Sequence, residues 1–107
     1  MTEPLSKLNA KVLSEHLHSK FKVHLDSDGK HMLELEIDEV IEPSAPPSLE
    51  QFFLILKGPR SPRLNQCTHR MEHEKLGTFD LFITAIAGDD HSITYEAVFN
   101  RLRKQQS

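Results

Sequence analysis

The chain has 107 residues and a mass of 12.3 kDa, which suffices for one hydrophobic core and is too short for two ordinary domains. Its formal net charge is -3, so it lacks the overall positive field on which non-specific nucleic-acid binding relies. Hydrophobic residues make up 37% and charged residues 27%, a balance typical of a folded chain. A single cysteine, Cys67, excludes an internal disulfide, so packing must stabilise the fold.

The N-terminal stretch, residues 1–12, has no basic region followed by a continuous apolar run. Nowhere does the chain hold the roughly 18 uninterrupted apolar residues that a membrane-spanning helix needs. We therefore predict a cytoplasmic protein without membrane insertion. Export by a route that needs no signal peptide is left open.

The first predicted element is an amphipathic helix over residues 5–20. Its apolar residues fall on one side of a helix with 3.6 residues per turn: Leu5, Leu8, Val12, Leu13 and Leu17. Asn9 is placed to cap the main body of this helix. We expect the apolar side to pack on the sheet of the same domain.

From Phe21 onward the apolar period changes to two, which predicts antiparallel strands over residues 21–101. The turn residues 26–29 predict a hairpin, and a slip in the alternation near Asp38 and Glu39 predicts a β-bulge. The expected strands cover residues 21–25, 31–41, 51–57, 67–73, 78–87 and 93–101.

Two of these strands carry apolar residues on both faces, which predicts cover on both sides. Residues 51–57 are expected near the centre of the sheet, and Phe82 and Ile86 suggest the same cover for residues 78–87. Residues 102–107 form a polar tail that is expected to fray. The predicted fold is α+β and mainly β: a single domain, residues 1–107, with one helix packed on a curled antiparallel sheet or small barrel of about six strands.

His69, Glu72 and His73 spell H-x-x-E-H, an inverted zinc-protease signature that requires both histidines on adjacent turns of one helix. The alternation of Cys67, His69, Met71 and His73 instead favours a strand. The two histidine Cα atoms would then lie roughly 13 Å apart, against about 6 Å on a helix. We predict no metal ligand, no cofactor and no catalytic residue, and keep a small zinc-dependent hydrolase as the alternative.

Cys67 and Arg101 each have polar residues that could serve as partners. Cys67 shares a predicted face with His69, but no oxyanion-stabilising loop follows it, so a buried, unreactive thiol is the favoured interpretation. Arg101 could pair with a strand carboxylate such as Glu72 or Glu96 and lock the edge of the sheet, and the alternative is an exposed arginine.

Two Pro-rich connections, residues 42–50 and 58–65, cannot continue central strands. Exposed loops of this kind are natural sites for contacts with other molecules. Pro46 and Pro47 in the first loop and Arg60 and Arg63 in the second are the predicted partner-binding residues. An exposed sheet edge is expected to complete the contact surface.

Several short motifs occur together along the chain: a Gly-Pro loop at residues 58–59, a strand ending in Glu72-His73, a Leu-Gly turn ending at Gly77, and the terminal Y-E-A-V-F-N-R at residues 95–101. This combination resembles an uncharacterised family of small bacterial domains of unknown function. The resemblance marks a set of structural motif residues: Glu72, His73, Gly77, Tyr95, Glu96, Asn100 and Arg101. His69 stands where the family usually has tyrosine, and the proline usual near Ala85 is missing.

Genes of that family often lie near genes for phage-tail-collar-like fibre proteins. The resemblance therefore implies an accessory or assembly partner of tail-like or surface fibres, which is an association rather than a mechanism. The predicted function is a non-enzymatic binding or assembly module with a protein partner and no nucleic acid. The alternatives are the zinc hydrolase and a self-associating structural subunit, and a homo-oligomer is left open.

Overall fold

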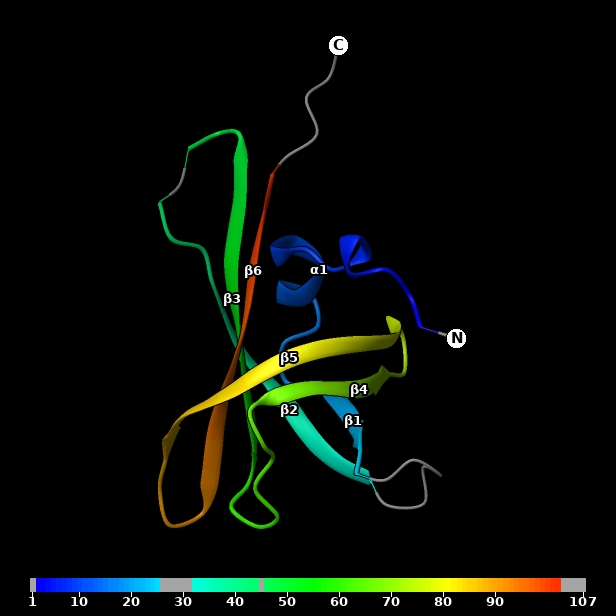
Figure 1. Ribbon diagram of the computed structural model, residues 1–107, viewed down its shortest axis with the longest axis vertical. Helices are drawn as coiled ribbons and strands as arrows, with labels where there is room; N and C mark the ends of the chain where they lie inside the picture. Colours follow the sequence, from blue (N-terminus) through cyan, green and yellow to red (C-terminus); the bar gives the residue numbers. More distant parts are fainter. Residues whose placement is uncertain (1, 26–31, 45, 103–107) are drawn as a thin grey trace.

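The computed structural model describes residues 2–25, 32–44 and 46–102. Within them the chain is mainly β, and its antiparallel strands close into a barrel in the order β1-β2-β3-β6-β5-β4 (Figure 1). The strands are β1 (Lys20–His24), β2 (Met32–Ile41), β3 (Leu49–Pro59), β4 (Cys67–His73), β5 (Gly77–Gly88) and β6 (Ser92–Leu102). The predicted six-stranded antiparallel architecture is confirmed. None of the described helices is long and apolar enough to cross a membrane.

The prediction of a helix over residues 5–20 is wrong in length. A 3-10 turn, η1 (Leu5–Lys7), is followed by a five-residue helix, α1 (Ala10–Ser14), whose predicted cap is confirmed: Asn9 Oδ1 accepts a hydrogen bond from the Val12 N–H at 2.8 Å. Helix formation stops because the chain joins the sheet instead. His18 adopts a left-handed φ of 71°, and its N–H donates to the Ile37 carbonyl at 2.7 Å. Backbone pairing with β2 outweighs the apolar period of residues 15–18.

The barrel interior is filled by the alternating inward residues of all six strands. Side chains that are almost completely buried include Phe21, Val23, Leu35, Ile37, Phe52, Leu54, Leu56, Met71, Phe79, Ile83 and Tyr95. Leu8 and Leu13 from the N-terminal segment join the same core. The register of β2 against β3 shifts between Ile37 and Glu39, which confirms the predicted bulge, and a second shift on β5 lies between Ala85 and Ala87. Bulges bend a strand, as closure of a small barrel requires.

The predicted cover on both faces holds for β3 but is wrong for β5. On the outer side of β3, Ile55 is buried and Phe53 is half-buried. On the outer side of β5, Phe82 and Ile86 are 54% and 49% exposed. The reason is that the barrel closes on itself, and α1 is too short to cover β5 as well. The predicted turn at residues 26–29 lies outside the described residues, although the antiparallel pairing of β1 with β2 confirms the hairpin. The predicted tail over residues 102–107 is wrong at Leu102, which pairs with Leu49 at the end of β6, and residues 103–107 lie outside the described residues.

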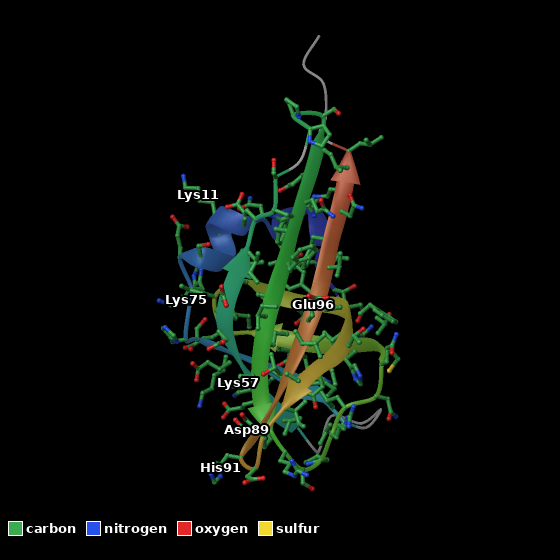
Figure 2. The ribbon with its side chains drawn as sticks, turned by 90° about the vertical axis from the view of Figure 1, so that its left-hand side faces the viewer. Lys11, Lys57, Lys75, Asp89, His91 and Glu96 are labelled. Carbon is green, nitrogen blue, oxygen red and sulfur yellow. The ribbon has the colours of Figure 1, made fainter. Side chains whose placement is uncertain are left out.

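Strands β3 and β6 pair along their whole length, from Leu49 opposite Leu102 to Pro59 opposite Ser92. The neighbouring strands β2 and β5 do not reach the end of this pair at Leu49 and Leu102. β2 ends at Ile41, opposite Phe53, and β5 pairs with β6 only as far as Thr84 opposite Glu96. The ends of β3 and β6 therefore project beyond the barrel as a two-stranded ribbon (Figures 1 and 2).

Candidate functional site

Four apolar side chains form a row across the outer surface of the barrel. Ile41 on β2 lies opposite Phe53 on β3, and Phe53 lies opposite Val98 on β6. Phe82 on β5 continues the row, since it lines the same shallow hollow as Val98. Ile41, Val98 and Phe82 are 38%, 55% and 54% exposed. We call these four residues the apolar row. A single exposed apolar residue needs no explanation, but a contiguous set across four strands makes this surface a candidate binding site.

The hollow beside the row lies where β5 and β6 part. Its walls come from Phe82 and Thr84 on β5, from Val98 on β6 and from Leu5 of the N-terminal segment. Leu5 is itself 42% exposed. The apolar surface therefore continues from the barrel wall onto the segment that precedes α1.

The row has different polar borders on its two sides. On one side, two residues along β3 from Phe53, Ile55 lies between Glu39 on β2 and Glu96 on β6. Neither glutamate forms an ion pair within the described part of the chain. On the other side Gln51 lies opposite Asn100, so this border is made of uncharged amides. Figure 2 labels Glu96 on β6, with Lys57 further along β3 toward the turn of Asp89 and His91. The charges that border Phe53 and Val98 are thus acidic, whereas Phe82 has Asp80 two positions away on β5, in an ion pair with Arg70 on β4.

The four predicted partner-binding residues do not form one surface. Pro46 and Pro47 precede β3, whereas Arg60 and Arg63 follow it, and the two loops lie at opposite ends of this strand in Figure 1. Eleven residues of strand separate them by roughly 33 Å. The Arg60 Nη1 group donates to the Asp89 carbonyl at 2.6 Å, and both arginines line a hollow beside Ile86. Each loop can contact a partner only separately.

The H-x-x-E-H residues lie on strand β4, as the alternation predicts, and not on the helix that the zinc chemistry requires. His73 is 5% exposed, and its Nδ1 accepts hydrogen bonds from the N–H groups of Lys75 and Leu76, at 3.1 and 3.2 Å. The proton must therefore be on Nε2, which donates to the Ser19 hydroxyl at 2.7 Å. Ser19 in turn donates to the His16 carbonyl.

This tautomer decides what the buried histidine can do. Burial, with a smaller effect of nearby His16, lowers the pKa of His73, so the ring is held neutral. Because Nε2 already carries a proton, it has no lone pair to accept one from Ser19, and the pair does not form an activated nucleophile. His73 instead joins β4, the following turn and the segment before β1.

The Cys67 thiol is exposed, so the prediction that it is buried is wrong. Its Sγ lies 3.3 Å from Nε2 of His69, but the same nitrogen lies 2.8 Å from the Asn65 carbonyl. That nitrogen must donate to the carbonyl and cannot take the thiol proton. The described residues include no group of three or more His, Cys, Asp or Glu placed to hold a metal ion.

The predicted pairing of Arg101 with a strand carboxylate is confirmed, but the partner is Glu50 on β3 and neither of the named examples, Glu72 and Glu96. The Arg101 Nε donates to Glu50 Oε1 at 2.8 Å, and its two terminal nitrogens donate to the carbonyls of Leu5 and Leu8 at 3.1 and 2.6 Å. Glu50 is the residue opposite Arg101 on β3, whereas Glu72 bonds His24. The guanidinium also lies 5.8 and 6.0 Å from the stacked rings of Phe52 and Phe99. Arg101 thus fastens the N-terminal segment to the ribbon.

The other structural motif residues divide into two groups. Tyr95 is buried, and its hydroxyl accepts the Leu64 N–H at 2.9 Å, which holds the loop after β3 against the barrel. Gly77 has a φ of 110°, a conformation that favours glycine, at the start of β5. Glu96 and Asn100 instead face outward and border the apolar row. The motif therefore has a structural part and a surface part.

The apolar row is not predicted from the sequence. Each member departs from the apolar and polar alternation of its strand, and that departure was the available signal. The pairing of β2, β3, β6 and β5 is what brings these departures together at one level of the barrel.

The fold and the site define a class: a small, closed, six-stranded antiparallel barrel with a short N-terminal helix, an internally satisfied histidine and an apolar outer row. A family model described as Domain of unknown function (DUF6916) matches residues 8–99, and the chain belongs to this family. No curated protein and no solved structure matches the chain.

Proposed function

We propose that this chain is a non-enzymatic protein-binding or assembly module that docks a partner on the apolar row. The observation that supports this function is the row itself, with three of its four side chains more than a third exposed and aligned across four strands. Desolvating such a surface is favourable, and aromatic residues at the centre of an interface contribute most of its energy.

The borders of the row favour one kind of partner. Glu39 and Glu96 are acidic neighbours without an ion pair in the described part of the chain, so lysine or arginine beside an apolar contact segment would complement them. The resemblance to domains encoded near fibre proteins supports a phage-tail-collar-like or surface fibre protein as the partner to test first.

Replacing Phe82 with serine should weaken binding of that fibre protein at least about tenfold, because an aromatic anchor is removed from the interface. Folding should be retained, since Phe82 is 54% exposed. Isothermal titration calorimetry with the purified fibre protein measures the effect.

The matched control is Met32→Ser, because Met32 is 43% exposed on β2 and lies outside the row. This variant should bind as the parent chain does. Equal weakening by both substitutions, or binding unaffected by Phe82→Ser, would show that the row is not the docking surface.

The zinc-hydrolase alternative makes a different prediction. Each ring nitrogen of His73 is engaged in a hydrogen bond, and Glu72 lies on the opposite face of β4 from His69 and His73. We therefore expect less than stoichiometric zinc in protein purified without a histidine tag, as measured by atomic absorption. One zinc per chain, lost on His73→Phe, would favour the hydrolase.

A further inference from the structure

The projecting part of β6 has a free edge. The Asp89 N–H donates to the Ser92 carbonyl at 2.9 Å, so Ser92 directs its backbone polar groups toward β5. Successive residues of a strand direct these groups alternately to the two sides, so Val98, Asn100 and Leu102 also direct theirs toward the β5 side. At the level of these three residues β5 no longer pairs with β6, because the last pair between the two strands is Thr84 opposite Glu96. No backbone partner for these three residues is found among the described residues.

The side chains along this edge are all exposed and uncharged, although 27% of the chain's residues are charged. Val98 and Leu102 are 55% and 81% exposed, Asn100 between them is exposed, and none carries a charge. An open, uncharged and partly apolar edge is a template for another strand, and proteins ordinarily protect such edges with lysine, proline or a covering segment. Figure 2 shows the end of β6 extending past β5, which flanks β6 lower in the view.

The edge is complementary to itself in one register. If two antiparallel copies of β6 are centred on Asn100, Val98 of each copy faces Leu102 of the other, and the two Asn100 amides face each other. A register centred on Phe99 or Arg101 would oppose apolar residues to Asn100, and one centred on Val98 would use Glu96, which is already paired with β5. Of these registers, only the one centred on Asn100 uses all three edge residues and places apolar residues opposite apolar residues and amide opposite amide.

We propose that two copies of this chain pair through the free edge of β6, antiparallel and centred on Asn100. The occupant is a second copy rather than a foreign strand because the apolar and amide residues of this edge are symmetric about Asn100, and Val98, Asn100 and Leu102 carry no charge. Pairing joins the two ribbons edge to edge and leaves their outer faces open, so the apolar rows of both copies lie on one continuous surface. This pairing adds to the proposed docking function, because it would place two docking surfaces together. The pairing itself can be tested with the purified chain alone.

Disulfide trapping tests the register. In a Cys67→Ser background, Asn100→Cys places two thiols at one antiparallel pair with Cα atoms about 5.5 Å apart, within the range that a disulfide spans. Val98→Cys is the matched control on the same strand and face, because its two copies would lie roughly 13 Å apart along the strands. Under mild oxidation we expect the Asn100→Cys chain to form at least about ten times more covalent dimer than the Val98→Cys chain.

Sedimentation of the parent chain across a concentration series provides the second measurement. We expect a reversible dimer that Asn100→Pro weakens at least about tenfold, because proline removes an edge N–H that β3 does not use. Equal or absent trapping of the two cysteine variants, or a monomer at every concentration, would overturn the pairing. A monomer that still binds the fibre protein would overturn only the pairing, whereas a dimer that binds no partner would count only against the docking function.

Discussion

Replacing Arg101 with alanine should lower the free energy of unfolding by about 3 kcal/mol, the largest effect expected of any polar residue in the described chain. The side chain is 28% exposed, and it is bonded to Glu50 and to the carbonyls of Leu5 and Leu8. Its removal leaves a partly buried carboxylate without this partner and frees the N-terminal segment. Urea denaturation measures the loss, and hydrogen exchange should increase over residues 3–14.

Two variants separate this role from the effect of charge alone. Arg101→Lys should recover only part of the stability, because an ammonium group cannot reach a carboxylate and two carbonyls in the same planar geometry. Arg70→Ala breaks an ion pair with Asp80 whose side chains are 55% and 44% exposed, and it should cost less than about 0.5 kcal/mol. A similar loss for Arg70→Ala and Arg101→Ala would contradict the role given to Arg101.

Replacing His73 with phenylalanine should cost about 2 to 3 kcal/mol, although the ring volume is nearly kept. The N–H groups of Lys75 and Leu76, whose hydrogen bonds to the ring are partly buried, lose their acceptor, and the Ser19 hydroxyl loses its donor. His91→Phe, at an exposed position in the turn before β6, is the matched control and should change stability by less than about 0.5 kcal/mol.

The same histidine should make stability depend on pH. Burial lowers the pKa of His73 below 6.5, its value in an unfolded chain. Between the folded pKa and 6.5 the unfolded chain binds one more proton than the folded chain, so stability is complete above about pH 6.5 and falls as the pH falls. The slope from this group is at most about 1.4 kcal/mol per pH unit. Urea midpoints from pH 7.5 to 5 should show this slope in the parent and in His91→Phe, and a smaller slope in His73→Phe.

These contacts give most of the structural motif residues a role within the fold. Tyr95 and His73 each join a loop or turn to the barrel, and Arg101 joins the N-terminal segment to the ribbon. Their polar atoms are used within the fold. The groups left for a partner lie on the outside: the apolar row, its acidic border and the free edge of β6.

The strands are predictable from local sequence, because a period of two is a property that each segment carries alone. The sequence placed β4 correctly at Cys67–His73 and thereby removed the helix on which the zinc motif depends. It also located the cap at Asn9 and the bulge near Glu39, since each depends on residues a few positions apart. The helix was overextended because Leu17 continues the helical spacing from Leu13, while the pairing of His18 with Ile37 is not visible locally.

Only the tertiary structure decided which residues meet across strands. Glu50 and Arg101 are 51 positions apart and face each other because β3 pairs with β6, so the choice of Glu72 or Glu96 could not be corrected from the sequence. Ile41, Phe53, Val98 and Phe82 come from four strands and align only once the register is set. Barrel closure likewise decided that Phe82 is exposed and that the end of β6 does not pair with β5, because both depend on where β5 leaves its neighbour.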